Sequence, residues 1–529
     1  MLYKDINSSV SLPFGTSKRF NINRGIRQGD PSSPYLFILI AELLAIYVKN
    51  SKDIKPLNVL GSQLLISQLA DDTTLFLRDV EQIPVAINLV SHFSKASGLQ
   101  LNFKKCELMA LHSHAESQLF NIPLKNEIKY LGIVITKDPK IREKSNLIDN
   151  MKKSQNILNM WVQRDISIFG RILIQKSEAL SRLIYPAFSL SISDRWIKDI
   201  NQIQYKFIWK NKHHYIRKSD VVKPISEGGL NVIDFDVMNG TLKLRWLQDF
   251  LRNTHSVWFS FSSKIFDSLG GIDFLLRCDF EPSKLKCKLS SFHSQVLLYW
   301  KLIYKHNFSP HSCSLWNNKC ILIKRKSVFF QDWMDKGVWS IVHIMDGDGN
   351  FLGYDVFCEK YNIICTKELY VSLLKAVPAG LVQLIKGALC YSPVIPRLGN
   401  LIISGINFTE QSCNNKVLRT LVNTQTFPSK VKKRLLVYDF PEDKVVQIRT
   451  RFLSFPLLPK VKENQENRKH LQTIYVPATM YLCPDSTDWT SLMDRSPVHK
   501  GRVRSDRIAA TQRPHLVSLL KELGSHPRA

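Results

Sequence analysis

Hydrophobic residues follow a helical period in two stretches of the first hundred residues. The apolar run 35–41 continues past Glu42 to Val48, and it follows Pro34. Proline suits the first turn of a helix, so we predict a buried helix that starts at Pro34 and ends within 49–52. A second helix is predicted where Gly98 is well placed to end it. Its apolar positions are Ile83, Ala86, Ile87, Val90 and Phe93.

Shorter segments have the pattern of strands. Residues 64–70 and 73–77 are two β-prone runs that flank Asp71 and Asp72. This arrangement predicts a hairpin with both carboxylates at its tip. In residues 99–103 apolar and polar positions alternate, and residues 130–135 form a further apolar run. We expect one strand in each of these two segments.

The signals change along the chain and divide it into four parts. Residues 1–137 alternate between helix and strand signals, whereas residues 138–247 are mainly helical and more basic. Residues 248–430 have a globular composition without a motif tied to chemistry, and residues 431–529 form a basic, polar tail that we expect to be largely disordered. The fold class predicted from these patterns is α+β.

Positive charge is concentrated after the first part. The 529 residues include 73 Lys and Arg against 45 Asp and Glu, a net charge of +28. Residues 1–140 contain 16 Lys and Arg against 12 Asp and Glu, so most of the excess lies beyond them. A polyanion is the expected partner, because cations gain most by displacing counterions from phosphate. Nucleic acid is favoured, and an acidic membrane surface is the competing interpretation.

Cysteine spacing and hydropathy indicate the compartment. The ten cysteines are dispersed, and none lies two or four residues from another, which argues against a zinc site built on a tight turn. We expect reduced thiols in an intracellular protein of the nucleus or cytoplasm. The longest apolar run is shorter than the roughly 20 residues that span a bilayer, and no secretory signal is visible. We therefore expect neither membrane insertion nor secretion.

Aromatic and cationic side chains interleave between Tyr205 and Lys218. Aromatic faces can stack on bases while cations hold phosphates, which suggests a nucleic-acid contact. An amphipathic helix end with core aromatics and solvated cations has the same pattern, and the sequence does not separate the two. The candidate contacts are Lys206, Trp209, Lys210, Lys212, Arg217 and Lys218.

Asp71 and Asp72 are the sharpest chemical signal. Neighbouring carboxylates repel, so a protein keeps them together with a cation nearby or with full solvation. Mg²⁺ prefers one or two carboxylates together with phosphate oxygens, and two such ions about 4 Å apart stabilise phosphoryl transfer. An isolated Asp-Asp pair is more often a surface turn, so the neighbouring motifs decide between the two interpretations.

Four motifs occur in the order found in reverse transcriptases. Residues 27–37, Arg-Gln-Gly-Asp-Pro-Ser-Ser-Pro-Tyr-Leu-Phe, resemble the Arg-Gln-Gly-x-Pro-x-Ser-Pro-x-Leu-Phe motif of that family. Residues 69–72, Leu-Ala-Asp-Asp, resemble its Phe/Tyr-Ala-Asp-Asp box. Residues 97–106 and 129–133 look like the next palm motif and the primer grip. Residues 207–209 and 227–230 are similar to segments of non-LTR (long interspersed element) retrotransposon polyproteins.

The resemblance implies part of a right-hand polymerase: a palm over 1–137, a thumb over 138–247 and a helical retrotransposon region over 248–430. It implies DNA synthesis on an RNA template from a DNA primer, with Mg²⁺ as cofactor, two ions if the enzyme is active. Asp71 and Asp72 would bind the metal, and Lys105 would protonate the leaving pyrophosphate. The nucleotide and template would contact Arg27, Gln28, Gly29, Pro31 and Ser33, and the primer end would contact Tyr130, Leu131 and Gly132.

The sequence departs from the family pattern before Arg27. The family has a third carboxylate on an earlier palm strand, and here Asp5 is the sole acidic residue before Arg27. The fingers are also missing, so we expect a truncated polymerase that is inactive or nearly so by itself. Two alternatives stay open. One is a non-catalytic RNA- or DNA-binding protein that uses the thumb-like and C-terminal regions, and the other is an enzyme completed by another chain or by upstream sequence.

Overall fold

The computed structural model describes residues 6–22, 25–26, 29–112, 118–214, 216–306, 308–391 and 400–427. The chain divides into two compact units after Arg142. The described residues of the first, called here the N-terminal unit, are those up to 142, and those of the second, the C-terminal unit, run from 143 to 427. The predicted tail 431–529 lies outside the described residues.

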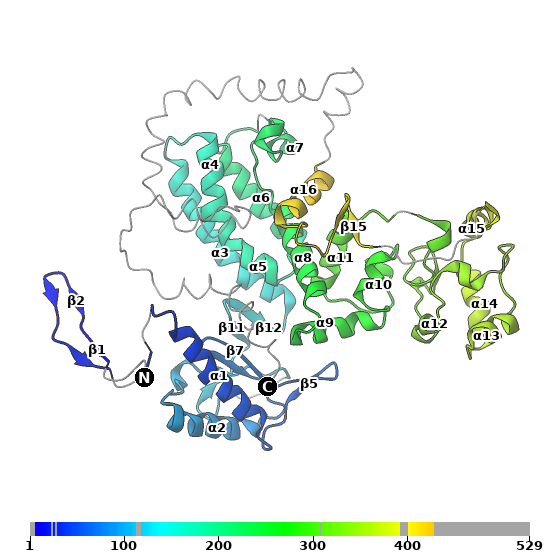
Figure 1. Ribbon diagram of the computed structural model, residues 1–529. Coiled ribbons are helices and arrows are strands. Elements are labelled where there is room, and N and C mark those ends of the chain that lie inside the picture. Colours follow the sequence, from blue (N-terminus) through cyan, green and yellow to red (C-terminus); the bar gives the residue numbers. More distant parts are fainter. Residues whose placement is uncertain are drawn as a thin grey trace. The chain divides into compact units, whose positions relative to one another are not determined.

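The N-terminal unit combines two helices with short antiparallel hairpins (Figure 1). Its helices are α1 (Ser33–Lys49) and α2 (Gln82–Ser97), with a 3₁₀ turn at Phe103–Lys105. Its strands are β1 (Asn7–Ser8), β2 (Ser11–Leu12), β3 (Gly15–Thr16), β4 (Phe20–Asn21), β5 (Leu57–Val59), β6 (Ser62–Leu64), β7 (Ile66–Leu69), β8 (Asp72–Leu75), β9 (Gln118–Leu119), β10 (Ile122–Pro123), β11 (Glu127–Tyr130) and β12 (Ile133–Thr136).

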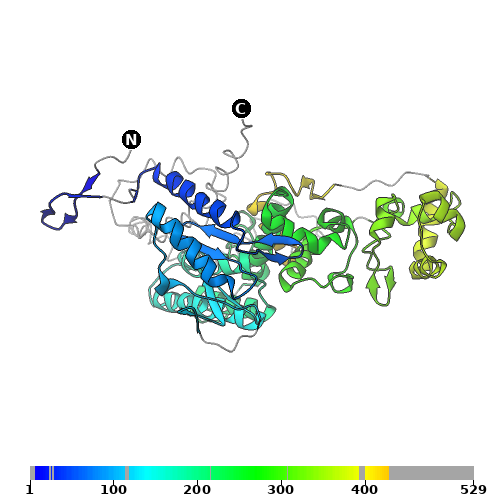
Figure 2. The same ribbon diagram turned by 90° about the horizontal axis from the view of Figure 1, so that it is seen from below.

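Each sheet in the described part of the chain has two strands. In the N-terminal unit, β1 pairs with β4 and β2 with β3, and the remaining strands pair consecutively, β5 with β6 through β11 with β12. Figure 2 shows α1, in dark blue, beside the lighter blue α2. Leu44 and Val48 of α1, Ala86 of α2 and Ile54 between them form the buried cluster, and side chains of β7 and β8 pack against it. This small core supports the strands that carry the aspartates.

The C-terminal unit is mainly helical. Its α-helices are α3 (Pro139–Val162), α4 (Ile168–Ile174), α5 (Ser181–Ser189), α6 (Asp194–Ile208), α7 (Lys218–Val221), α8 (Phe235–Arg252), α9 (Val257–Asp267), α10 (Ile272–Arg277), α11 (Ser291–Ile303), α12 (Gln331–Asp335), α13 (Tyr354–Tyr361), α14 (Lys367–Ala376), α15 (Ala379–Tyr391) and α16 (Asn415–Thr426). A π-helical segment, Gln175–Leu180, joins α4 to α5, and 3₁₀ turns lie at Ile225–Glu227, Pro282–Lys284, Pro310–Ser312 and Ile341–Ile344. Two hairpins complete the unit, β13 (Leu322–Ile323) with β14 (Lys326–Ser327) and β15 (Ile402–Ile403) with β16 (Ile406–Asn407).

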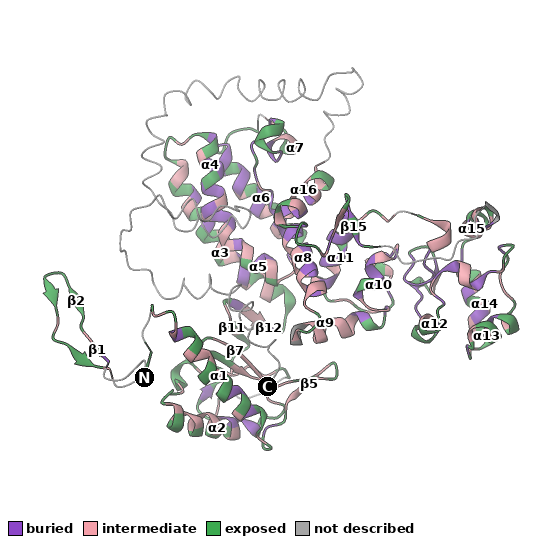
Figure 3. Ribbon diagram, viewed as in Figure 1, coloured by how far each residue is buried: buried purple, intermediate pink, exposed green. Residues whose placement is uncertain are grey.

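Helix α8 lies between two hydrophobic clusters. Phe235 and Met238 belong to a cluster built with α3, α5 and α6, whereas Leu244 and Leu247 belong to a larger one that includes α11 and α16. Buried residues, purple in Figure 3, therefore run along much of α8. Because α16 packs on α8, residues near 420 lie beside residues near 240.

None of the described helices alone is long and apolar enough to cross a bilayer. The pair Lys367–Ala376 and Ala379–Leu389 meets the criterion together, but it is bent by 85° at the break between the two helices.

Several predicted elements are confirmed. The first helix spans Ser33–Lys49 with Pro34 in its first turn, and the second ends at Gly98, whose φ is +76°. The hairpin around Asp71 and Asp72 is present as β7 and β8. The α+β class is also confirmed, with helices and small antiparallel sheets.

Two strand predictions are wrong. Residues 99–102 are irregular and lead into the 3₁₀ turn, where the Asn102 side chain accepts a hydrogen bond from the Lys104 amide at 3.1 Å. The apolar run 130–135 is not one strand, because it bends at Leu131 and Gly132 and forms the turn between β11 and β12. Both turn residues have positive φ, +48° and +84°, as a type I′ turn requires.

Candidate active site

The β7–β8 hairpin positions the two aspartates. Leu69 pairs with Asp72, so Ala70 and Asp71 are the two turn residues and Asp72 is the first residue of β8. Ala70 has a φ of +50°, in the left-handed region that glycine prefers. The turn is held in this conformation by the flanking strands, whose apolar side chains Ile66 and Leu75 pack against the α1–α2 core.

Both carboxylates are exposed to solvent. No described cation forms an ion pair with Asp71 or Asp72. Two adjacent carboxylates suit a hard divalent cation such as Mg²⁺, which takes oxygen ligands. Within the described ranges, no cluster of three or more His, Cys, Asp or Glu side chains is arranged to hold a metal. The hairpin therefore presents two adjacent carboxylates to solvent.

The turn into α1 contains the described part of the first motif. Arg27 and Gln28 lie outside the described residues. Gly29 has a φ of +90°, and no other atom stands within 4 Å of where its Cβ would be, so glycine is needed there for its backbone conformation. The Asp30 carboxylate accepts hydrogen bonds from the Ser32 amide at 3.0 Å and from its hydroxyl at 2.9 Å.

The other two candidates of this motif lie on either side of Ser32. Pro31 is exposed, whereas Ser33 is buried at the start of α1. Because Ser33 is buried, it is better placed to shape the turn than to contact nucleotide or template directly. Asp30, which the motif leaves variable, closes this turn, and sequence reasoning missed it although aspartate favours such turns.

The predicted primer grip lies against the aspartate hairpin. The Tyr130 hydroxyl is 2.7 Å from the Ser67 hydroxyl, which joins β11 to β7. Ser67 lies on the same strand that leads to Asp71, so two motifs that are 60 residues apart in the sequence are in direct contact. Leu131 is half-buried and Gly132 is exposed at the adjacent type I′ turn.

Lys105 ends the 3₁₀ turn and its side chain is exposed. The turn is fixed by the Asn102 side chain and by the bond from the Lys105 amide to the Asn102 carbonyl at 2.9 Å. The Lys105 ammonium group is thus accessible to solvent and to an anion. The backbone that carries it is held by hydrogen bonds.

The basic aromatic segment of the C-terminal unit splits into a buried and an exposed half. Tyr205, Phe207 and Trp209 are 2%, 4% and 5% exposed, so their rings belong to the core. The Trp209 ring stacks on His214, with centroids 6.1 Å apart. Trp209 therefore does not offer a free face for a base, which corrects the prediction that it contacts nucleic acid by stacking.

The cations of this segment lie on the surface. Lys206, Lys212, Arg217 and Lys218 are exposed, and Lys210 pairs with Asp165 at 3.4 Å. The Lys218 ammonium also stands 4.8 Å from the Tyr205 ring centroid, a cation–π contact that fixes its position. The surface of α6, α7 and the segment between them therefore presents positive charge, whereas Trp209 offers no free ring face.

A buried carboxylate beneath this surface was missed by sequence reasoning. Asp234 is 3% exposed and caps α8 by accepting a hydrogen bond from the Asp236 amide at 2.9 Å. It also accepts from Asn201 Nδ2 at 3.0 Å, which ties α8 to α6. Burial raises the pKa of Asp234 above its ordinary value, and these hydrogen bonds act in the opposite direction. An aspartate just before a helix is an N-cap signal that the sequence did offer.

The Glu227-Gly228-Gly229-Leu230 segment has a structural reason for both glycines. Gly228 has a φ of +76° and ends the 3₁₀ turn. A Cβ on Gly229 would stand 2.1 Å from the Lys223 carbonyl oxygen, so no other residue fits without moving the backbone. Leu230 then enters the core beside Trp209.

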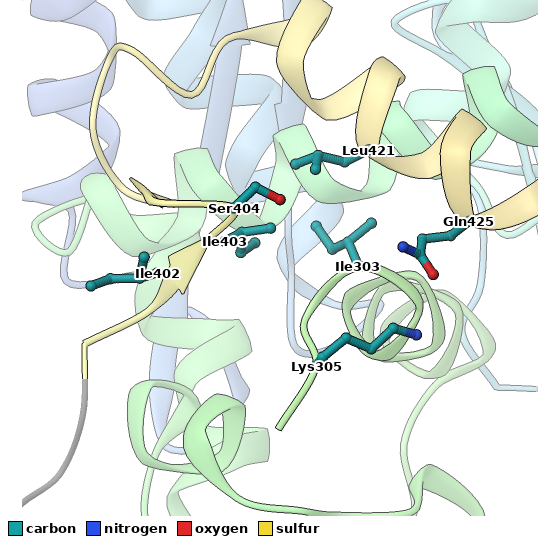
Figure 4. A pocket seen from close by; sticks show the side chains of 7 residues that line it. All are labelled: Ile303, Lys305, Ile402, Ile403, Ser404, Leu421 and Gln425. Atoms are coloured by element: carbon teal, nitrogen blue, oxygen red, sulfur yellow. The ribbon is translucent and has the colours of Figure 1, made fainter. Parts of the chain in front are cut away.

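The described residues also form a cavity of about 230 Å³ in the C-terminal unit. Figure 4 shows its lining side chains, which come from the end of α11, the β15–β16 hairpin and α16. They are Ile303, Lys305, Ile402, Ile403, Ser404, Leu421 and Gln425. None of the predicted site residues lines this cavity, and its lining includes no carboxylate, histidine or cysteine. It therefore lacks the groups that metal-assisted phosphoryl transfer requires.

Comparison with known proteins agrees with the motifs. Residues 3–135 match the family described as reverse transcriptase (RNA-dependent DNA polymerase). The chain is 23% identical over 257 residues to the Transposon TX1 uncharacterized 149 kDa protein of Xenopus laevis, covering 47% of this chain and 20% of that protein. It is 27% identical over 155 residues to the retrovirus-related Pol polyprotein from type-2 retrotransposable element R2DM of Drosophila melanogaster, covering 26% of this chain and 14% of the polyprotein.

The matches thus span a fifth or less of the length of these relatives. The family match over residues 3–135 includes the Asp71–Asp72 hairpin, the turn at Gly29 and the Tyr130 strand, which are the elements on which the resemblance depended. Residues 3–135 therefore form a reverse transcriptase domain, and the similarity to non-LTR retrotransposon proteins supports the ancestry of an RNA-directed DNA polymerase.

Proposed function

We propose that this chain takes part in RNA-templated DNA synthesis, with residues 1–137 as part of a polymerase palm and residues 138–247 as its thumb. The observation that carries the proposal is the β7–β8 hairpin, which exposes Asp71 and Asp72 at its turn. The hydrogen bond between Ser67 and Tyr130 adds support, because it joins the predicted primer grip to this hairpin.

Asp71 and Asp72 would hold Mg²⁺ through their carboxylate oxygens. When bound, the metal would neutralise phosphate charge during nucleotidyl transfer. The neighbouring residues would position the reactants. In this proposal, Arg27, Gln28 and Gly29 contact the nucleotide and template, and the β11–β12 turn holds the primer end.

Lys105 is proposed as the proton donor to the leaving pyrophosphate. Its exposed ammonium group is on a hydrogen-bonded turn, where it can approach an anion without losing an internal partner. A cation at this place also offsets the charge that develops on the leaving oxygen.

Within the described ranges, the two aspartates are not joined by further acidic ligands. We propose that a third carboxylate reaches them from another chain. Because ligands that act as a unit are not additive, polymerase activity of this chain alone should be lower by orders of magnitude than that of a complete site.

Primer extension tests this function. The chain would be incubated with an RNA template, an annealed labelled DNA primer, deoxynucleotides and Mg²⁺, and compared with the D71N/D72N variant. We expect slow extension that the variant loses. The matched control is D79N/E81Q, which removes two exposed carboxylates from the same unit and should extend like the unmodified chain. Equal extension by D71N/D72N and the unmodified chain would contradict the polymerase proposal.

The exposed cations of α6 and α7 favour a second candidate, RNA or DNA binding without catalysis. Lys206, Lys212 and Arg217 are exposed, and Lys218 is held in place over Tyr205. In this case binding should weaken steeply as salt rises, and it should be independent of Asp71 and Asp72. A salt titration of binding to single-stranded RNA separates this candidate from catalysis, since binding that survives D71N/D72N does not require the metal site.

A further inference from the structure

A second group of cations lies far along the sequence from α6 and α7. The β13–β14 hairpin carries Lys324 and Arg325 as its two turn residues, and Lys326 begins β14. All three are exposed, and within the described part of the chain no carboxylate forms an ion pair with Lys324 or Arg325. The tip of this hairpin therefore presents uncompensated positive charge to solvent.

The preceding segment brings more cations to the same place. The Lys326 ammonium donates to the Ser283 carbonyl at 2.9 Å, and the Lys284 ammonium lies 3.4 Å from the Lys319 carbonyl. These bonds hold the hairpin and Lys319, which precedes it, against Ser283 and Lys284. We call this group of cations the hairpin patch; its members are Lys284, Lys319, Lys324, Arg325 and Lys326.

Acidic neighbours neutralise little of the hairpin patch. Asp279 pairs with Lys319 at 2.8 Å. Glu281 pairs with Lys301, which is outside the patch, at 3.2 Å. Within the described residues, these are the ion pairs formed by carboxylates next to the patch. Its remaining cations keep a strong local excess of positive charge.

The root of the hairpin is rigid. Ile321 and Val328, which flank the two strands, are buried in a hydrophobic cluster with Trp316, and Ser327 is 3% exposed. The Asn317 amide donates to the Val328 carbonyl at 3.0 Å. The cations are thus presented by an anchored element, so little order would be lost when a ligand binds.

The turn itself uses unusual residues. Five described hairpins have positive φ at both turn positions, and four of them have Gly or Asn at the second position: Gly61, Asn121, Gly132 and Gly405. The fifth has Lys324 at +49° and Arg325 at +65°. Long side chains are disfavoured in this conformation, and such strain is concentrated at functional sites. Two cations stand where an Asn-Gly turn would be more stable.

We propose that the hairpin patch binds the phosphate backbone of nucleic acid, as a surface separate in sequence from the α6–α7 cations. A phosphate backbone fits because it offers several anions in a row to cations from three segments. An anionic membrane is less favoured, because the tip carries Lys and Arg without an exposed large apolar side chain that could enter a bilayer. This inference deepens the proposed function by locating contacts to the same class of partner.

Fluorescence anisotropy with labelled single-stranded RNA and DNA tests the proposal over a range of salt concentrations. We expect K324Q/R325Q to bind about 10- to 30-fold more weakly near 0.1 M salt, with a log–log salt slope shallower by about 1.4, because each phosphate contact contributes about 0.7. The matched control is K367Q/K375Q, which removes two exposed lysines of α14 and should bind within about twofold of the unmodified chain.

A second variant separates charge from folding. K324N/R325G removes the same two charges and installs residues that favour the turn, so it should lose the same binding while its thermal midpoint rises. Full binding by K324N/R325G and K324Q/R325Q would overturn the proposal, as would a loss no larger than that of K367Q/K375Q.

The outcome also distinguishes this inference from the proposed function. If K206Q/R217Q weakens binding and K324Q/R325Q does not, the hairpin patch is excluded while nucleic-acid binding by the chain stands. If the unmodified chain binds neither RNA nor DNA, both fail. Sedimentation with phosphatidylserine vesicles is the last arm: loss of vesicle binding in K324Q/R325Q with unchanged RNA affinity would assign the patch to a membrane and overturn the proposal.

Discussion

The hydroxyl groups of Ser67 and Tyr130 lie 2.7 Å apart and join two hairpins of the N-terminal unit. Y130F removes this bond, and we expect it to lower the free energy of unfolding by about 1 kcal/mol. Urea unfolding measures the change. In a double-mutant cycle, S67A/Y130F should cost no more than the larger single change, because both remove the same interaction.

The control for this prediction is Y35F. Tyr35 is 45% exposed on α1, so loss of its hydroxyl should leave stability within experimental error. If Y130F is as stable as Y35F, the bond does not hold the hairpins together.

Lys243 is fully buried in α8 and donates to two backbone carbonyls at the C-terminal end of α5. Its ammonium group bonds the Ala187 carbonyl, the Leu190 carbonyl at 2.7 Å and Asn239 Oδ1 at 3.2 Å. K243M leaves these acceptors without their donor, so we expect a loss of about 2–4 kcal/mol in the free energy of unfolding. K198M, at an exposed lysine of α6, is the control and should change stability little.

Lys243 also gives stability a pH dependence. Burial lowers its pKa to about 7 from the ordinary 10.5. Between these values the unfolded chain binds more protons, so the free energy of unfolding should rise with pH from about 7 to about 10.5. Chemical unfolding at several pH values measures the rise, which K243M should lack. The same slope in K243M would show that another group is responsible.

His293 is expected to make the free energy of unfolding depend on pH in a lower pH range. It lies among Trp246, Phe266 and Phe292, and burial lowers its pKa to about 4. The unfolded imidazole titrates near 6.5, so stability that is complete above pH 6.5 should be lost as pH falls toward 4. H293Q should flatten this part of the pH profile of thermal unfolding, and H255Q, at an exposed position, should not.

Cys358 and Cys365 form the closest described pair of thiols, with their Sγ atoms 4.0 Å apart. Glutathione disulfide should oxidise them: a sulfur–sulfur bond forms, both thiol protons leave, and the two electrons reduce glutathione disulfide to two thiols. Peptide mass spectrometry would detect the loss of two hydrogen atoms. Burial raises the pKa of Cys365 to about 11, so oxidation should accelerate as pH rises.

C365S is the control for this reaction. It should form at most a mixed disulfide between Cys358 and glutathione. If the unmodified chain also stops at that mixed disulfide, the two thiols do not approach each other closely enough to react.

Residue patterns within a short segment predicted the helices of the N-terminal unit. Helical spacing together with Pro34 and Gly98 gave both helices of the N-terminal unit, because these residues act within their own turn of chain. The strand prediction over 130–135 was wrong because Leu131 adopts a positive φ, which its residue type does not signal. Gly132 was the available clue, since a hairpin turn favours glycine there.

The motifs predicted which residues belong to the candidate site, but not the contacts between them. Asp71 and Tyr130 were named from the sequence, but their connection through Ser67 depends on how two hairpins meet. The burial of Trp209 likewise follows from packing against Leu230 and Val221, which no helical period reveals. Asp234 and Lys243 are buried polar groups whose partners lie on other helices, and sequence spacing does not predict such pairs.

Helix α8 couples the unfolding of two hydrophobic clusters in the C-terminal unit. Since its opposite sides complete two hydrophobic clusters, neither cluster can melt while the helix stays seated in the other. Heating should therefore produce one shared calorimetric transition for these two clusters in place of two. A chain with this design would either keep both clusters intact or lose them in a single step.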